Sequence, residues 1–265
     1  MALAGAGAPP TVIAYSWAPQ ENYWPSVPTP HPSGLAPFLS AHHTLQAAGV
    51  RTPRLLYASE PDDLALVEDI PGDTLETTFT TDPARAAKAL AKLAVALDHM
   101  AAHTCPADHT SEDVTLTRAL DDLTEAATRD PRINAATSAL TDHLHELHTA
   151  LTPRPTHSLV HGELGPDHIL LTPDAHPVLI DIESLTHSDP EQEHAYLRLR
   201  FGPHYAPLSR PLDPTRLSLH TVALHLSLVA GPLRLLDGDF PDRDAMRGIV
   251  EHNTRETLRL VGMVG

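Results

Sequence analysis

SLVHGELGPDHILLTPDAHPVLIDIE is the sequence of residues 158–183. Two short apolar runs, 169–171 and 178–180, flank a stretch rich in Thr, Pro and Asp. Short apolar runs separated by turn residues are typical of a β-hairpin, so we expect a strand on each side of the turn at 172–177. Chemically active side chains are expected at the open end of this hairpin.

The second strand of a hairpin returns antiparallel to the first. Asp181, which follows the second strand, is therefore expected beside Asp167 and His168, which precede the first. Glu163 lies a few loop residues upstream. Carboxylates and an imidazole thus converge at one end of the hairpin, which is the arrangement that a metal-phosphate site requires.

The spacing within this stretch resembles a known catalytic loop. His161, Glu163 and His168 take the His, Asp and Asn positions of the kinase pattern H-R-D-x-x-x-x-N. Asp181 follows where the metal-binding Asp of that pattern is expected. The segments HGELGPDHIL, LIDIE and SDP resemble the HGDxxxxNIL, VIDWE and GDP motifs of the aminoglycoside phosphotransferase and choline kinase family, and the resemblance extends over roughly residues 35–205.

This resemblance implies an α+β protein with the protein-kinase-like two-lobed fold, in which a reduced N-terminal β lobe precedes a larger helical C-terminal lobe. We expect the reduced lobe, an arm with residual strands and one helix, in residues 1–70. The helical lobe is expected in 71–265 and includes the hairpin at 158–183. A chain of 265 residues with 42% hydrophobic side chains is long enough to bury such a core.

The resemblance also implies roles for the residues of the motif. Glu163 and His161 are the candidate catalytic residues, with Glu163 orienting the acceptor hydroxyl or accepting its proton. Asp181 is the principal candidate ligand of Mg²⁺. Three further candidate metal ligands lie beside it: His168, Asp167 and Glu183.

Residues 64–75 (LALVEDIPGDTL) resemble the hinge of this family, whose backbone groups hydrogen-bond the purine of ATP or GTP. Glu68, Asp69 and Ile70 are therefore candidate nucleotide contacts. The following segment, 83–102, has apolar residues at helical spacing and resembles the first long helix of the second lobe.

Two residues depart from the family pattern, and both alter the chemistry. Glu163 keeps a carboxylate but moves it outward by one methylene, and a misplacement of about 1 Å can lower a rate about a hundredfold. His168 offers an imidazole, which suits transition metals, whereas Mg²⁺ prefers oxygen ligands. Asp167 can take over this ligand position if the loop shifts. Glu183, two residues after Asp181, would face the same side in a continuing strand.

The opposite wall of the expected cleft also departs from the pattern. Kinases place a strand Lys on the α and β phosphates, orient it with a helix Glu and cover the phosphates with a Gly-rich loop. This chain has two lysines, Lys88 and Lys92, and both lie in the expected helix after the hinge. The candidate strand, 11–15, has Ala14 or a neighbour in place of the Lys, and the candidate helix, 37–48, contains no Glu. We therefore expect a truncated or degenerated N-terminal lobe.

Three functions remain open. The first is transfer of the γ-phosphate of ATP or GTP to a hydroxyl of a small molecule, with Mg²⁺ as cofactor. The second is a non-catalytic kinase-like protein that binds a nucleotide, a metabolite or a protein partner, and the third is transfer to a peptide Ser or Thr. The missing Lys and Glu favour the second, whereas the retained His161, Glu163 and Asp181 favour the first, which is the function that we expect.

Composition narrows the choice of partners. The formal net charge of −16 disfavours nucleic acid, whose phosphates require a basic footprint. An acidic cleft suits a cationic or polyhydroxyl small molecule. Cys105 is the only cysteine, so an intramolecular disulfide is impossible and a reducing, cytoplasmic location is expected.

Two further segments bear on targeting. The sequence after Met1 has no basic segment followed by an apolar core, so we expect no secretory signal. The most apolar segment, 217–236, is interrupted by His, Gly, Pro and Arg. We expect a buried helix that stops near Gly231, and no membrane span.

Helical spacing predicts further helices at 113–127, 135–151, 191–201, 213–236 and 242–260. In the third of these, Glu193 is expected to support the catalytic loop. Arg198 and Arg200 are expected either to hold an anionic group or to form surface ion pairs.

The remaining features are aromatic and imidazole side chains. Residues 1–34 are rich in Pro, Gly and Ser and carry Trp17, Tyr23 and Trp24, which we expect to pack against the lobe, with contact to a ligand as the alternative. Histidine pairs at helical spacing, such as His145 and His148, are interpreted as solvated residues and not as a metal site.

Overall fold

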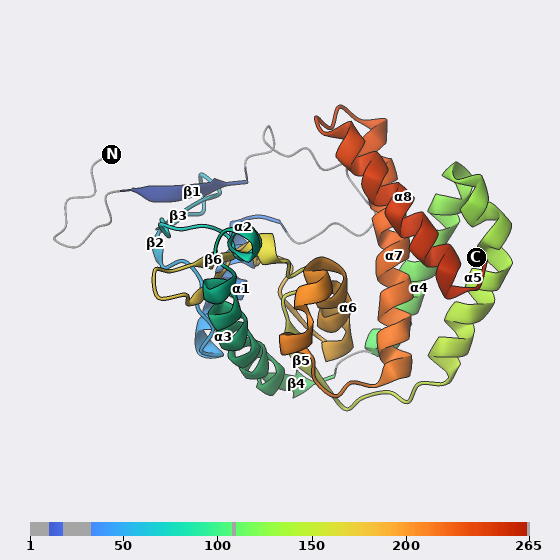
Figure 1. Cartoon of the computed structure of the whole chain (residues 1–265), viewed down its shortest axis with the longest axis horizontal. Helices are drawn as coiled ribbons and strands as arrows, with labels where there is room; N and C mark the ends of the chain where they lie inside the picture. Colours follow the sequence, from blue (N-terminus) through green and yellow to red (C-terminus); the bar gives the residue numbers. More distant parts are fainter. Residues whose placement is uncertain (1–10, 18–32, 108–109, 264–265) are drawn as a thin grey trace.

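The computed structural model describes residues 11–17, 33–107 and 110–263. It shows an α+β protein-kinase-like architecture with a small β lobe and a larger helical lobe (Figure 1). Tyr23 and Trp24 lie outside the described residues.

The small lobe consists of one sheet and one helix. Strands β1 (Val12–Ser16), β3 (Leu64–Glu68) and β2 (Leu55–Ser59) form an antiparallel sheet in the order β1-β3-β2. Helix α1 (Leu35–Ala47) follows β1 in the chain and buries its apolar face in the core. The expected strand and helix are therefore present, each shifted by one or two residues.

The large lobe begins with two helices that start at capped positions. Thr74 caps α2 (Leu75–Thr81) and Asp82 caps α3 (Pro83–Ala102), each by accepting a hydrogen bond from a backbone N–H of the first turn. Helix α3 has the bounds expected from its apolar spacing. Its side chains also hold the hairpin turn, because Arg85 donates to the carbonyls of Leu171 and Thr172 and Lys92 donates to that of Asp174.

Short strands flank the loops that carry the motif residues. Strands β4 (Thr104–Pro106), β5 (Thr156–Val160) and β8 (Thr186–Ser188) form a second antiparallel sheet. After β5 the chain passes through the 3₁₀ turn η2 (Pro166–His168) into the hairpin of β6 (Ile169–Leu171) and β7 (Pro177–Leu179). The antiparallel register pairs Ile169 with Leu179, which confirms the expected hairpin.

The remaining helices form the far end of the molecule. Figure 1 shows α4 (Ser111–Arg129), α5 (Pro131–Thr149), α7 (Pro214–Asp237) and α8 (Arg243–Leu260) packed together at the end opposite the small lobe. Helix α6 (Pro190–Phe201) lies between them and the hairpin, and the 3₁₀ turns η3 (Gly202–His204) and η4 (Ala206–Leu208) lead from it towards α7.

The expected end of α7 near Gly231 is wrong. The helix continues through Pro232 to Asp237, although an internal proline removes one backbone hydrogen bond at a cost of about 3 kcal/mol. Packing against α4, α6 and α8 supplies the compensation, because Leu226, Val229 and Leu235 are buried on both sides of the proline. By length and composition α7 is apolar enough to cross a membrane, but 56% of that window is buried, and core helices meet the same criterion.

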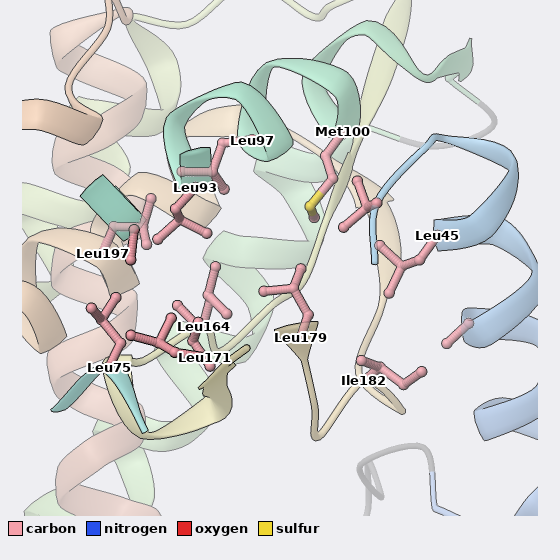
Figure 2. Close-up of a cluster of buried hydrophobic side chains, with 14 of the residues drawn as sticks. Leu45, Leu75, Leu93, Leu97, Met100, Leu164, Leu171, Leu179, Ile182 and Leu197 are labelled. Atoms are coloured by element: carbon pink, nitrogen blue, oxygen red, sulfur yellow. The ribbon is translucent and has the colours of Figure 1, made fainter. Parts of the chain in front are cut away.

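The main hydrophobic core joins the two lobes. Figure 2 shows leucines of α3, α6, the hairpin and the loop that matches the catalytic-loop motif (residues 161–168, hereafter the catalytic loop) converging with Leu45 of α1. The same core includes Ala65 and Val67 of β3. The division into residues 1–70 and 71–265 remains a prediction, since this core extends across residue 70.

Candidate active site

The catalytic loop begins with a turn that only glycine makes without strain. Gly162 has φ +96°, and a Cβ atom there would lie 3.0 Å from the carbonyl oxygen of Ser184. Glycine thus lets the loop pass close to the segment that follows β7. This contact brings Glu163 beside Ser184.

Glu193 of α6 holds this turn through hydrogen bonds to its backbone, as the sequence predicted. Its Oε2 atom accepts hydrogen bonds from the backbone N–H of His161 at 2.6 Å and of Gly162 at 3.1 Å. Burial raises the pKa of Glu193 to about 7, although both backbone hydrogen bonds favour the carboxylate. The carboxyl group therefore positions the loop from a site that water does not reach.

His161 links the loop to the hairpin. Its Nε2 atom lies 3.1 Å from the carbonyl oxygen of Ile180, so Nε2 carries the proton and donates it. Burial lowers the pKa of His161 to about 4. The imidazole is thus neutral at pH 7, and its contacts are those of a positioning residue.

Glu163 is half-buried and oriented by its neighbour. The hydroxyl of Ser184 donates to Oε1 of Glu163 over 2.6 Å. The hydrogen bond fixes the direction of a carboxylate that is longer than the aspartate of the family motif. Sequence reasoning did not identify Ser184, because a serine in a loop gives no signal of its partner.

Asp181 lies beside His168, as the hairpin geometry predicted. Its Oδ2 atom is 3.2 Å from Nε2 of His168, and 54% of its side chain is exposed. We expected Glu183 to face the same side as Asp181 because both would lie in a continuing strand. This expectation is wrong, because β7 ends at Leu179 and Asp181 has φ +59°, which is outside strand geometry. A left-handed Asp is uncommon, and such outliers concentrate at functional sites.

The carboxylate of Asp167 is paired with an arginine, whereas a metal-ligand role requires its oxygens to face a metal ion. Arg200 of α6 donates to both of its carboxylate oxygens, at 2.6 and 2.7 Å. Arg200 therefore forms one of the ion pairs that the sequence left open. The backbone carbonyl of Glu163 accepts from Nδ1 of His168 at 3.2 Å, so His168 connects the loop to Asp181.

A pocket of about 400 Å³ opens between the small lobe and the end of the hairpin. It is lined by aromatic, apolar and acidic residues: Tyr15, Trp17, Phe38, Pro53, His168, Leu179, Ile180, Asp181, Ile182 and Glu183. Asp181 and Glu183 thus share one pocket without sharing a strand. The indole N–H of Trp17 donates to the carboxylate of Glu183, while burial and the charge of Asp181 raise the pKa of Glu183.

Tyr15 lies on β1, the strand on which the kinase pattern predicts the missing Lys. Ala14 is exposed on the outer face of β1, whereas Tyr15 faces the pocket and α1. Its ring lies 5.5 Å from that of Phe38 on α1, the helix in which the expected Glu is missing. An aromatic pair thus connects the strand and the helix between which the kinase pattern places a Lys–Glu ion pair. The sequence signal for it was the period of two that places Tyr15 and Trp17 on one face of β1.

The sequence pattern of a phosphotransferase enzyme family matches residues 26–211 of the chain. The chain belongs to this phosphotransferase enzyme family. Among the curated proteins, none matches the chain.

Solved structures with the same fold include choline kinases and aminoglycoside phosphotransferases. Choline kinase LicA from Streptococcus pneumoniae superposes with a TM-score of 0.62 at 13% identity, covering 86% of this chain and 80% of its own. A choline/ethanolamine kinase family protein from Mesorhizobium loti gives 0.61 at 16% identity, covering 86% and 78%. A thermostable mutant of aminoglycoside phosphotransferase APH(4)-Ia, in a ternary complex with ADP and hygromycin B, gives 0.56 at 18% identity, covering 85% and 82%.

The hinge of this phosphotransferase-family chain does not line the pocket. The backbone N–H of Glu68 donates to the carbonyl of Arg54 at 2.9 Å, and the Asp69 carboxylate accepts from the hydroxyl of Thr11 at 2.6 Å. Ile70 is buried. Their role as purine contacts stays a prediction from the resemblance.

Some of the candidate metal ligands have the chemistry that Mg²⁺ prefers, and others do not. Asp181 and Glu183 offer carboxylate oxygens to the pocket, and Mg²⁺ is commonly held by one or two carboxylates together with substrate phosphates. Within residues 11–17, 33–107 and 110–263, no group of three or more His, Cys, Asp or Glu side chains is arranged to hold a metal ion. The two carboxylates thus fit a metal that a substrate helps to bind, while His168 and Asp167 do not fit Mg²⁺ as they stand.

Proposed function

We propose that the chain is a phosphotransferase that moves the γ-phosphoryl group of a nucleoside triphosphate to a hydroxyl group of a small molecule. The observation that carries this proposal is the intact mechanical support of the catalytic loop. Glu193 holds the loop backbone, and Ser184 orients the carboxylate of Glu163. A chain that used this loop only as a surface turn would not need an oriented carboxylate.

In this proposal Glu163 accepts the proton of the acceptor hydroxyl, or orients that hydroxyl for attack on the γ-phosphorus. Asp181 and Glu183 would hold Mg²⁺, which when bound neutralises charge on the transferring phosphate. His161 stays neutral and maintains the distance between the loop and the hairpin. Positioning and charge stabilisation account for most of the catalysis of phosphoryl transfer, so these contacts are the relevant ones.

Both substrates are proposed from the family. The structure of APH(4)-Ia with ADP and hygromycin B supports a nucleotide and a hydroxylated acceptor. We propose ATP or GTP as the donor and a small hydroxylated molecule as the acceptor, with a peptide Ser or Thr as a less favoured acceptor. The net charge of −16 disfavours nucleic acid, and the single Cys105 agrees with a cytoplasmic location.

A second function has its own observation in favour. An aromatic pair, Tyr15 and Phe38, connects β1 and α1, and neither side chain carries the positive charge that kinases place on the α and β phosphates. A non-catalytic kinase-like protein would retain the fold and the pocket without phosphoryl transfer.

Nucleotide binding separates the two functions. Titration of the full chain with ATP and GTP, with and without Mg²⁺, should show Mg²⁺-dependent binding, followed by turnover against a panel of hydroxylated small molecules. Asp181→Ala should abolish the Mg²⁺ dependence, whereas Asp244→Ala, an exposed site on α8, should leave it unchanged. Absence of ATP and GTP binding at millimolar concentration would remove the phosphotransferase proposal and leave the non-catalytic protein.

A further inference from the structure

Two histidines meet on the second sheet, away from the pocket. His103 is the C-cap of α3 and leads into β4, and His187 lies in β8. Strand β5 runs between β4 and β8, and its Leu159 is the neighbour of both residues. Leu159 pairs with His187 in the register and donates its backbone N–H to the carbonyl of His103 at 3.0 Å. The sheet thus brings together two imidazoles that are 84 residues apart in the chain.

The distance between the two rings suits a shared metal ion. Nδ1 of His103 lies 3.4 Å from Nε2 of His187, and the ring centroids are 5.6 Å apart. Hydrogen bonds from N–H groups usually have lengths of about 2.7–3.2 Å, so this contact is long for a hydrogen bond. Two nitrogens that each lie about 2.0–2.1 Å from a tetrahedral Zn²⁺ ion are separated by about 3.4 Å. The imidazoles therefore have the spacing of two ligands of one ion.

The surroundings of the pair also favour metal binding. Both side chains are half-buried, so solvent and ions reach them while the backbone of the sheet holds their positions. Burial lowers the pKa of His187, and the neighbouring His103 and His157 lower it further. His187 is therefore neutral at pH 7, and a neutral imidazole has one nitrogen with a lone pair to offer to a metal.

We propose that His103 and His187 together bind a divalent transition-metal ion such as Zn²⁺. Nδ1 of His103 and Nε2 of His187 are its two protein ligands. In the part of the chain that the structure describes, no group of three or more His, Cys, Asp or Glu side chains is arranged to hold a metal ion, so water completes the coordination. Imidazole suits Zn²⁺, whereas Mg²⁺ prefers oxygen ligands. Neither histidine lines the pocket of Asp181, so the site is independent of the proposed function.

Zinc titrations of the full chain test the site. The Kd of Zn²⁺ is measured at substoichiometric Zn²⁺ by competition with a chromophoric zinc indicator, which reports the site of highest affinity. His103→Ala and His187→Ala should each raise this Kd by at least about tenfold, because one of only two protein ligands is lost. His145→Ala, which removes an exposed imidazole on α5, is the matched control and should leave the Kd within about twofold. If both ligand variants bind Zn²⁺ like the control, the proposal fails.

Two further measurements show whether the histidines share one ion. The double variant with both substitutions should bind Zn²⁺ no more weakly than the weaker single variant, because either substitution alone already removes the site. Additive losses would mean two separate sites and would overturn the proposal. The unfolded chain does not hold His103 beside His187, so Zn²⁺ should raise the Tm of the unsubstituted protein and of His145→Ala, and should raise it less in either ligand variant.

Competition with Mg²⁺ keeps this site separate from the pocket. A large excess of Mg²⁺ should not displace Zn²⁺ from two imidazoles, and Asp181→Ala should leave the Kd of Zn²⁺ within about twofold. Displacement by Mg²⁺, or loss of Zn²⁺ binding in Asp181→Ala, would place the ion in the pocket and overturn the proposal. Binding of Zn²⁺ that depends on His103 and His187 supports it whether or not the chain binds a nucleotide.

Discussion

The Oε2 atom of Glu193 lies 2.6 Å from the backbone nitrogen of His161, although 32 residues separate the two in the chain. The same oxygen accepts from Gly162, so one buried carboxyl group satisfies two consecutive backbone donors of the catalytic loop. Helix α6 therefore determines where the loop begins. The position of Glu163 depends on this support, because it follows Gly162 directly.

Glu193→Ala should destabilise the protein by about 2–5 kcal/mol, since two buried N–H groups lose their acceptor. Glu193→Gln keeps an acceptor oxygen and should cost much less. Urea unfolding of both variants measures the difference. Equal losses for Ala and Gln would show that the negative charge, and not the hydrogen bonds, holds the loop.

Glu193 also predicts a pH dependence of stability. Burial raises its pKa from 4.5 to about 7 in the folded protein. A raised carboxyl pKa contributes stability that is fully present below about pH 4.5 and is lost as the pH rises through about 7. Relative to Glu193→Gln, the free energy of unfolding of the unsubstituted protein should fall by about 2 kcal/mol between pH 5 and pH 8. Parallel pH curves for the two proteins would contradict this value.

Local patterns in the sequence were sufficient for most of the fold. The bounds of α3 follow from its Asp82 cap and apolar spacing, and the hairpin follows from two apolar runs around a turn. Asp181 and His168 meet because the antiparallel register requires it. These relationships lie within one element or between neighbouring ones, where periodicity and turn chemistry carry the information.

Long-range contacts escaped sequence reasoning. Nothing local indicates that Arg200 takes both oxygens of Asp167, or that Tyr15 meets Phe38 in place of an ion pair. The continuation of α7 through Pro232 likewise depends on tertiary packing, which outweighs the local preference of proline.

Arg216 forms a buried ion-pair cluster whose contribution to stability can be measured. Its NH1 group lies 3.0 Å from Glu112 and 2.9 Å from Asp189, and 2% of its side chain is exposed. Burial alone would raise the pKa of Asp189, but hydrogen bonds from His220 and Ser111 and the charge of Arg216 hold it well below its usual range.

Arg216→Met should therefore cost about 3–5 kcal/mol, because buried Glu112 loses its cation and buried Asp189 keeps as ionic partners only Arg154, in a longer ion pair at 3.4 Å, and His220. Arg247→Met removes an exposed partner of Asp244 and should cost less than about 1 kcal/mol. Denaturant unfolding compares the two. A loss below 1 kcal/mol for Arg216→Met, the level of a surface pair, would show that water reaches the cluster.

His168→Asn tests the metal end of the pocket. The amide supplies an oxygen donor beside Asp181, which suits Mg²⁺ better than the imidazole does. We expect the Kd of Mg²⁺, titrated in the presence of a non-hydrolysable ATP analogue, to fall by about tenfold. His176→Asn, an exposed site in the hairpin turn, is the control. If His168→Asn leaves the Kd of Mg²⁺ unchanged, His168 does not limit metal binding.

Tyr15→Lys tests whether the aromatic side chains of the small lobe limit nucleotide binding. The substitution places an ammonium group in the pocket that Asp181 and Glu183 line, on the strand where the family pattern places a phosphate-binding Lys. ATP should bind about tenfold more tightly, because its phosphates gain a cation. Tyr15→Phe keeps the aromatic face and should leave the affinity for ATP within about twofold of the unsubstituted protein. Unchanged binding of ATP to Tyr15→Lys would show that this side of the pocket does not contact the phosphates.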